Sequence, residues 1–183
     1  RQPATLIRPP GAAEVDFGQL CVRCGACLRV CPTQGLQPSL VEGGVQNLLT
    51  PRLVPRLGPC LFSCTACGQV CPTRAIPGLG LAEKQATAIG LARVDRDRCL
   101  PWAYDTPCIV CEEMCPVPDK AIELEEVEAA TRSGESLLLQ RPKVVGALCI
   151  GCGVCEFHCP AAGEAAIRVT TLPGEGDAAP LGV

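Results

Sequence analysis

The chain has 183 residues, a net charge of −3 and 3% aromatic residues, which is too few large rings for an ordinary aliphatic–aromatic core. No basic stripe interleaves with aromatic residues, which argues against nucleic-acid binding. No apolar run reaches the roughly 18 residues of a membrane helix, so we expect no direct membrane span. The 16 cysteines, 19 glycines and 18 prolines predict a loop-rich fold in which bound metal centres form the core.

The first and last segments are expected to lie outside that fold. Residues 1–14 show no periodicity, and we expect an extended N-terminal arm there. Residues 173–183 are expected to form a tail. Either end is interpreted as a loose terminus, with wrapping around a partner as the alternative.

Four cysteine runs occupy the chain between these segments, and each ends in Cys-Pro. They are Cys21-x2-Cys24-x2-Cys27-x3-Cys31 (run one), Cys60-x3-Cys64-x2-Cys67-x3-Cys71 (run two), Cys99-x8-Cys108-x2-Cys111-x3-Cys115 (run three) and Cys149-x2-Cys152-x2-Cys155-x3-Cys159 (run four). No cysteine lies outside the runs. In bacterial ferredoxins, three closely spaced thiolates bind one cubane cluster and the fourth binds a second cluster. We therefore predict four [4Fe–4S] clusters, with all sixteen cysteines as iron ligands.

Short elements are expected around the runs. Each run is interpreted as a loop that enters one short helical turn. Strand-like pieces precede runs two, three and four at 52–55, 90–95 and 143–145, and an Ala-Ile pair follows each of these three runs at 75–76, 121–122 and 166–167. Residues 81–89 and 122–131 are expected to be short helices.

Three other cysteine chemistries fit the pattern less well. Structural zinc uses two Cys-x2-Cys pairs per metal, often with histidine, and leaves the third cysteine of each run without a role. A disulfide scaffold is poorly served by four Cys-x2-Cys-x2-Cys repeats. A redox Cys-x2-Cys active site has no need of four copies.

Few other residues offer chemistry. His158 is interpreted as a hydrogen-bonding neighbour of Cys159 rather than as a ligand. Trp102 and Tyr104 are expected to pack the eight-residue loop of run three over a cluster. The acidic residues between 123 and 128 are interpreted as the solvated face of a helix, or alternatively as a docking patch for a basic redox partner.

The motifs resemble those of four-cluster polyferredoxins of the NapG/MauM type, which accompany periplasmic nitrate reductase and methylamine dehydrogenase. The resemblance covers most of residues 8–169 and is carried by Arg8-Pro9-Pro10-Gly11-Ala12, Thr50-Pro51, Cys71-Pro72-Thr73, Asp119-Lys120-Ala121-Ile122 and Ala165-Ala166-Ile167-Arg168-Val169 together with the four runs. It implies an α+β fold with two dicluster-ferredoxin-like lobes, short helices and short two-stranded sheets. Members are typically exported folded by the twin-arginine route and lie against the outer face of the cytoplasmic membrane. A periplasmic, peripheral location is therefore expected, with a cytoplasmic one as the alternative, and a missing leader would explain a start at Arg1.

The sequence leaves two ways to pair the runs. The chain also resembles four-cluster subunits of membrane-bound molybdenum oxidoreductases, which use a nested form, and we favour nesting. It gives an outer lobe of residues 15–50 plus 140–172 and an inner lobe of 51–139. The nested ligand sets are Cys21, Cys24, Cys27 and Cys159; Cys149, Cys152, Cys155 and Cys31; Cys60, Cys64, Cys67 and Cys115; and Cys108, Cys111, Cys99 and Cys71. The sequential alternative has lobes 15–85 and 86–172.

Function is expected to be electron transfer without catalysis, because the cysteines are all used and no nucleotide loop or other catalytic set is present. The resemblance implies redox partner subunits, either a membrane-anchored redox subunit or a multihaem cytochrome. The alternative is an iron–sulfur maturation factor or a cluster-bearing enzyme, which needs a cluster with an open iron site.

Overall fold

The computed structural model describes residues 6–12, 14–130 and 136–171, so the expected tail at 173–183 lies outside it. The helices are α1 (Glu14–Leu20), α2 (Ala26–Val30), the 3-10 helix η1 (Val45–Asn47), α3 (Ala66–Gln69), α4 (Leu81–Ala86), α5 (Leu100–Ala103), α6 (Val110–Glu113) and α7 (Val154–His158). The strands are β1 (Leu36–Pro38), β2 (Pro51–Leu53), β3 (Leu91–Val94), β4 (Ile122–Ala130), β5 (Ser136–Val144) and β6 (Ile167–Thr170). The described residues form three two-stranded antiparallel sheets, β1-β2, β3-β6 and β4-β5, and the fold is of the α+β type.

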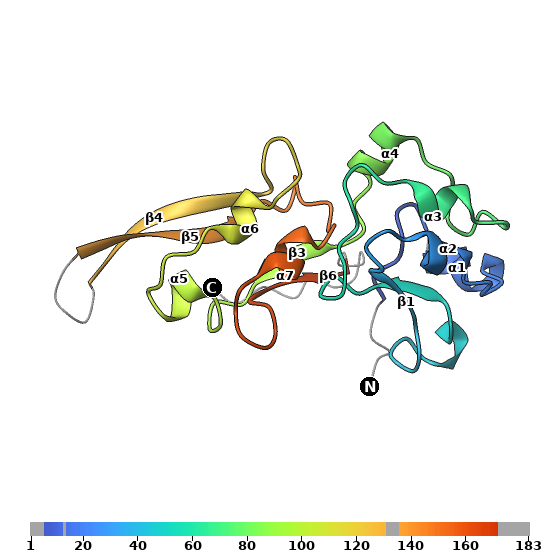
Figure 1. Cartoon of the computed structure of the whole chain (residues 1–183), viewed down its shortest axis with the longest axis horizontal. Coiled ribbons are helices and arrows are strands. Elements are labelled where there is room, and N and C mark those ends of the chain that lie inside the picture. The colour runs from blue at the N-terminus through green and yellow to red at the C-terminus, as the bar shows by residue number, and fades with distance from the viewer. Residues whose placement is uncertain (1–5, 13, 131–135, 172–183) are drawn as a thin grey trace.

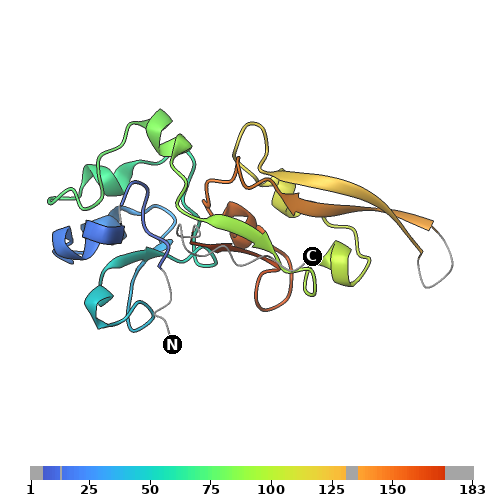
Figure 2. The same ribbon diagram turned by 180° about the vertical axis from the view of Figure 1, so that it is seen from behind.

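The molecule is elongated, and the chain runs from one end to the other and then returns to the middle. Figure 1 shows α1 to α4 and β1 at one end, β4, β5, α5 and α6 at the other, and α7, β3 and β6 between them. The view from behind shows the same separation (Figure 2). None of the helices in the described part of the chain is long and apolar enough to cross a membrane.

Among the described residues, two larger hydrophobic cores follow the order of the sequence, with Ile7 packed against both, and a smaller third cluster of Cys99, Ala161 and Ala166 lies in the second half. The buried residues of the first core are Phe17, Cys27, Leu36, Leu53, Ala75 and Ile76. Those of the second core are Ala92, Cys111, Ile122, Cys155, Ile167 and Val169. The first core therefore draws on the regions of runs one and two, and the second core on those of runs three and four.

This division corrects the nested arrangement that we favoured from the sequence. β1 pairs with β2 in the register Leu36↔Leu53, so the segment after run one folds back directly beside the segment before run two. In the second half the equivalent pairing is that of β4, after run three, with β5, before run four, and β3, before run three, pairs with β6, after run four, in the register Leu91↔Thr170. Closing a short loop costs less conformational entropy than closing a long one, which favours pairing run one with run two over pairing it with run four.

The helix expected at 81–89 is confirmed as α4, which is shorter, and the one expected at 122–131 is wrong. Residues 122–130 instead form β4, which pairs with β5 over nine residue pairs and projects from one end of the molecule (Figure 1). The acidic residues therefore lie on a strand and not on a helix. Two of them face basic residues across the sheet, Glu123↔Lys143 and Glu125↔Arg141. Opposite charges directly across an antiparallel pair stabilise it, so pairing outweighs the local helix propensity of this segment.

The N-terminal arm packs on the first core wherever it is described. Leu6 is 5% exposed, and the amide of Leu53 donates to the carbonyl of Ile7 at 2.8 Å. The Arg8 guanidinium is buried and donates to Thr50 Oγ1 at 2.9 Å and to the carbonyl of Pro51 at 3.0 Å. The expectation of a loose arm is therefore wrong for residues 6–12.

Candidate metal centres

Each cysteine run has the same local conformation. The third cysteine lies in a short helix, which is α2 in run one, α3 in run two, α6 in run three and α7 in run four. The helix ends at or just before the fourth cysteine, because the proline that follows lacks an amide donor and restricts the residue before it to an extended conformation. The fourth cysteine is thereby directed away from its own run.

The cysteines line three cavities in groups of four. The cavities hold Cys21, Cys24, Cys27 and Cys71; Cys31, Cys60, Cys64 and Cys67; and Cys99, Cys108, Cys111 and Cys159. The four cysteines that remain are Cys115, Cys149, Cys152 and Cys155, and we take them as the fourth group, with Cys149 packed against the core that contains Cys155. Cys149 and Cys115 both raise the pKa of Cys152, and Cys152 and Cys149 raise that of Cys155, in addition to the larger effect of burial.

These groups correct the nested ligand sets. Cys31 lies with the triplet of run two and Cys71 with that of run one, whereas nesting placed Cys31 with run four. Cys159 likewise lies with run three and Cys115 beside run four. The fourth cysteines are exchanged between sequential neighbours, one and two, three and four.

The groups fit a cubane better than a single metal ion. Among the described residues, no three His, Cys, Asp or Glu side chains are close enough together to hold one ion. Four thiols instead surround a hollow, as is required when each of them binds a different corner of a cluster. Zinc needs four ligands converging on one point at about 2.3 Å for sulfur, so the arrangement disfavours zinc.

The protonation of the thiols is set chiefly by burial. Burial, reinforced by neighbouring cysteines, raises the pKa of Cys27, Cys67 and Cys99 to about 11 and that of Cys111 to about 12. Thiolates so shielded from water need a compensating cation, and iron supplies it. The structure therefore fits metal-bound thiolates better than free ones.

Backbone amides point at the fourth cysteines. The amides of Ile76, Ala121 and Ala166 donate to the Sγ atoms of Cys71, Cys115 and Cys159 at 3.4, 3.4 and 3.3 Å. These donors belong to the Ala-Ile pairs that follow runs two, three and four, and all six residues of the pairs are buried. Burial raises the pKa of Cys71, but hydrogen bonds led by the Ile76 amide outweigh it, so the net pKa is lowered. N–H donors to sulfur are one of the means by which proteins tune the potential of a cluster.

Phe17 lines the cavity of run one, whereas Trp102 and His158 are not among the residues that line the three cysteine cavities. The His158 ring is exposed and packs edge-on against Phe157 at a centroid distance of 5.0 Å. Trp102 lies between the guanidinium groups of Arg96 and Arg141, at 4.3 and 4.9 Å from its ring centre. Its Nε1 donates to the carbonyl of Pro142 at 3.3 Å, which ties the eight-residue loop of run three to β5.

Sequence reasoning missed three basic residues that bind carbonyl groups of the runs. Lys84 is 3% exposed and donates to the carbonyls of Leu61 and Phe62 in run two. Lys120 donates to carbonyls in run three, and Arg56 to carbonyls in run four. No single motif marks them, because each is brought to its run by the fold; only Lys120 lay within a segment singled out by the resemblance.

A family model supports the grouping of runs one and two. The model of the 4Fe-4S dicluster domain matches residues 20–75, a span that contains these two runs and no other. The fold and the cysteine groups thus define an iron–sulfur protein of the ferredoxin class.

Curated relatives extend the likeness over most of the chain. The methylamine utilization ferredoxin-type protein MauM of Methylorubrum extorquens is 41% identical over 180 residues, which cover 94% of this chain and 74% of the relative. MauM of Paracoccus denitrificans is 38% identical, with 91% and 71% covered. The ferredoxin-type protein NapG of Escherichia coli K12 is 35% identical, with 87% and 68% covered. The chain belongs to the MauM/NapG family of ferredoxin-type [4Fe–4S] electron-transfer proteins.

Proposed function

We propose that the chain holds four [4Fe–4S] clusters, one in each cysteine group, and conducts electrons along a single line of sites. The order along this line is run one, run two, run four, run three, which differs from the order in the sequence. The observation that carries the proposal is the contact between the two halves: the amide of Cys60 donates to the carbonyl of Cys152 at 2.8 Å. The triplets of runs two and four therefore meet at the middle of the molecule.

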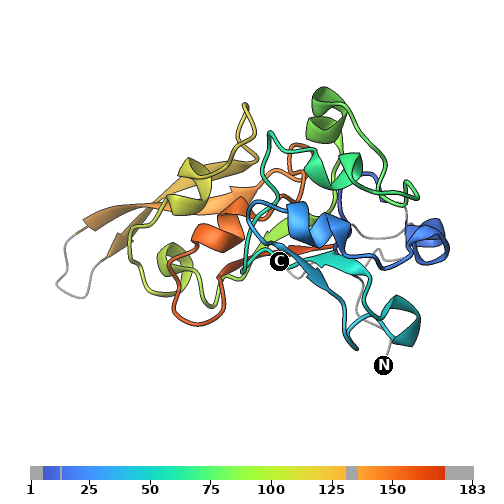
Figure 3. The same cartoon turned by 45° about the vertical axis from the view of Figure 1, so that its right-hand side comes forward.

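Neighbouring groups are also close within each half. Cys27 of run one contributes to the raised pKa of Cys67 in run two. Cys111 of run three contributes in the same way to that of Cys155 in run four. Figure 3 shows α7 of run four between α6 of run three on one side and α2 and α3 of runs one and two on the other. Two dicluster lobes of residues 15–85 and 86–172, joined at runs two and four, would produce this line.

The residues of the chain have four tasks in this mechanism. When bound, the clusters supply one-electron oxidation and reduction. The thiolates hold them, and the buried Ala-Ile pairs exclude water from one side. The amides directed at sulfur stabilise negative charge, which tunes the potentials. The contact between Cys60 and Cys152 fixes the distance between the halves.

The two ends of the line are the places where redox partners would dock. Cys24 of run one is exposed. At the other end, Tyr104 in the loop of run three is 64% exposed. We propose that one end faces a membrane-anchored redox subunit or a multihaem cytochrome, and that the chain lies on the periplasmic face of the cytoplasmic membrane. The names of the MauM relatives support a place in methylamine utilization.

Analysis of iron and electron transfer tests the proposal. Anaerobically prepared protein is expected to contain about sixteen irons and as many acid-labile sulfides, four of each per cluster. After a reducing pulse, electrons are expected to equilibrate among the clusters of one molecule at a rate independent of protein concentration. About eight irons, stoichiometric zinc, or turnover of a small-molecule substrate by the chain alone would contradict the proposal. Ready loss of one iron from a single group would favour the alternative of an enzyme or maturation factor.

A further inference from the structure

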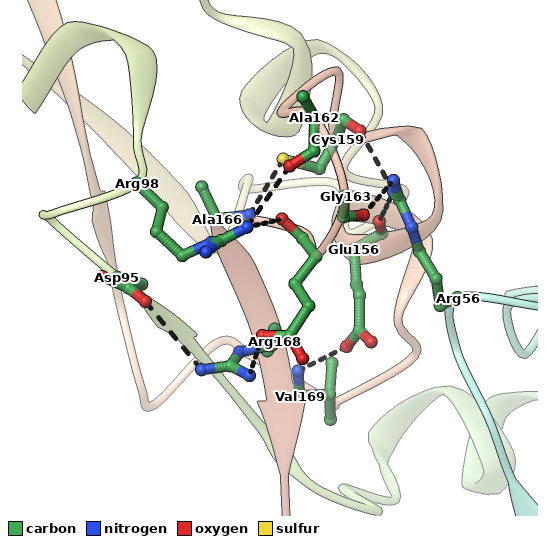
Figure 4. A network of polar contacts seen from close by, with 11 residues as sticks. Arg56, Asp95, Arg98, Glu156, Cys159, Ala162, Gly163, Ala166, Arg168 and Val169 are labelled. Carbon is green, nitrogen blue, oxygen red and sulfur yellow. Dashed lines mark hydrogen bonds and ion pairs between the residues drawn. The ribbon is translucent and has the colours of Figure 1, made fainter. Parts of the chain in front are cut away.

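Arg56 crosses from the first half of the molecule to the end of α7. Its Nη1 donates to the carbonyls of Glu156 and Cys159 at 3.0 and 3.1 Å, with Phe157 further away at 3.5 Å. Its Nη2 donates to the carbonyl of Gly163 at 3.3 Å. Figure 4 shows this guanidinium between the end of α7 and the loop that follows it. The last carbonyls of a helix lack their usual partners within the helix. The carbonyl of Glu156 accepts a long bond of 3.4 Å from the Cys159 amide, and Arg56 adds a shorter one there and donates to the carbonyls of Cys159 and Gly163 as well.

Run three satisfies the equivalent carbonyls from within its own half. Lys120 Nζ donates to the carbonyls of Glu112, Glu113 and Cys115 at 2.9, 3.0 and 3.2 Å. These residues follow Cys111 by one, two and four positions, as Glu156, Phe157 and Cys159 follow Cys155. Lys120 comes five residues after Cys115, whereas the residue five after Cys159 is Glu164, an anion. Run four therefore has no cation of its own at this place, and Arg56 of the other half takes the position.

The two halves pack closely at the same junction, where there is no room for a side chain on Gly153. Gly153 of run four has a φ of +79°, and a Cβ built on it would lie 2.4 Å from Cβ of Pro55, the residue before Arg56. The hydrogen bond from Cys60 to Cys152 lies in the same junction. The Arg56 side chain is itself exposed, so it bridges runs two and four at the solvent edge of this tight junction.

We infer that Arg56 is a positioning residue for electron transfer between the two halves, an inference that rests on the proposed line of clusters. By binding the end of α7, it holds run four against run two and keeps the contact between Cys60 and Cys152 short. Arginine suits this task because its planar fork offers several donors in fixed directions, whereas lysine offers a point charge. Arg56 forms no hydrogen bond with a cysteine Sγ atom and acts through the backbone carbonyls that it binds.

Arg98 provides a matched control. Its Nη2 donates to the carbonyls of Ala162 and Glu164 at 3.3 and 3.2 Å, in the same loop after Cys159 (Figure 4). Arg98 itself belongs to the second half, so replacing it removes one positive charge and two hydrogen bonds near that loop without touching the junction. Arg56→Gln and Arg98→Gln therefore remove the same charge, and only the first opens the contact between halves.

The experiment compares both variants and Arg56→Lys with the unchanged full chain. We measure iron content, spin–spin splitting in the electron paramagnetic resonance spectrum of the fully reduced protein, and equilibration between the halves after a reducing pulse. Arg56→Gln is expected to keep its iron, lose the splitting that arises across the junction and equilibrate more slowly. Arg56→Lys is expected to show splitting and an equilibration rate between those of Arg56→Gln and the unchanged chain. Arg98→Gln is expected to match the unchanged chain in both.

The outcomes separate the inference from the function on which it rests. An unchanged chain with fewer than four clusters, or with no transfer between them, would overturn the proposed function. Transfer in the unchanged chain that Arg56→Gln leaves intact, or that Arg98→Gln slows equally, would overturn only the role of Arg56. Loss of iron from both Arg56 variants but not from Arg98→Gln would assign Arg56 to assembly and would likewise overturn the inference.

Discussion

Cys31 belongs to run one in sequence but lies beside run two in the structure. It follows α2 of run one, yet it lines a cavity with Cys60, Cys64 and Cys67 of run two. Burial raises its pKa, but hydrogen bonds led by that of Thr33 outweigh this effect, and the net pKa is lowered. Burial instead raises the pKa of Cys60 and Cys67 in the same group to about 11, so Cys31 is more readily ionised than either of them.

Replacing Cys31 should identify its cluster. Cys31→Ser is expected to perturb the signal of the cluster held by run two and to leave that of run four unchanged, because Cys31 completes the group of run two. Cys159→Ser is the matched variant and should perturb the cluster of run three. Resonance spectra recorded on stepwise reduction check both, and a change in the run-four cluster on loss of Cys31 would restore the nested pairing.

Lys84 offers a test of electrostatic tuning. Its ammonium group is buried and lies near Cys60, whose pKa burial raises and Lys84 lowers. Lys84→Met removes a positive charge that favours the reduced, more negative cluster, so the run-two potential should fall by roughly 60 mV, a tenfold change in a one-electron equilibrium. Redox titration measures the shift. Glu83→Gln, on the exposed side of the same helix, should change the run-two potential little. A shift equal in size and opposite in sign would show that the potential responds to net charge and not to the position of the Lys84 charge beside Cys60.

At the scale of elements, two equivalent glycines have different neighbours. Gly25 and Gly153 each precede the short helix of their run, with φ of +70° and +79°. A Cβ on Gly25 meets only Leu28 Cδ1 at 4.0 Å, whereas one on Gly153 meets Pro55 of the other half at 2.4 Å. The strain of a left-handed conformation is common to both positions, and the steric overlap belongs to Gly153 alone.

The pair Gly25→Ala and Gly153→Ala separates these effects. Gly25→Ala should cost about 1–2 kcal/mol of stability, the strain of an L-residue in this conformation. Gly153→Ala should cost about 1–3 kcal/mol more, because the junction is overpacked. Loss of cluster absorbance with rising guanidinium, under anaerobic conditions, compares the two. Equal effects would mean that Pro55 moves aside freely.

The elements also show what a sequence can predict. Cys-Pro punctuation and spacing predicted the four helical turns and the exchange of the fourth cysteines, because these follow from local geometry. The choice of partner run was wrong, since it depends on which strands pair, β1 with β2 and β3 with β6, and the cysteine spacing alone does not determine that pairing. Residues 122–130 were misassigned because Glu and Ala favour a helix locally, whereas pairing with the neighbouring strand 136–144 decides. Arg56 was missed because nothing in its own segment points to run four.

For the whole molecule, the thiols are part of the core, so removal of iron should unfold it. Cys27, Cys99, Cys111, Cys152 and Cys155 are all at most 9% exposed. A chelator is expected to remove most of the circular dichroism of the folded state together with the clusters.

The buried thiols make the stability of the iron-free chain depend on pH in the alkaline range. The pKa of several buried thiols is raised from 9.0 to about 11 in the folded chain, so their contribution to stability is present below pH 9 and is lost as pH rises through about 11. Any structure left in the iron-free chain should therefore melt between these pH values. The iron-loaded chain should not, since its thiolates are already bound. Parallel alkaline titrations followed by circular dichroism check this, and identical curves would contradict it.

The most direct test of the account is an anomalous difference map at the iron edge from crystals of anaerobically prepared protein. The account predicts four compact iron peaks in one line, in the order run one, run two, run four, run three, with Cys31 at the second peak and the contact between Cys60 and Cys152 separating the second from the third. Fewer than four peaks, or a map in which Cys31 reaches the iron of run four, would contradict it.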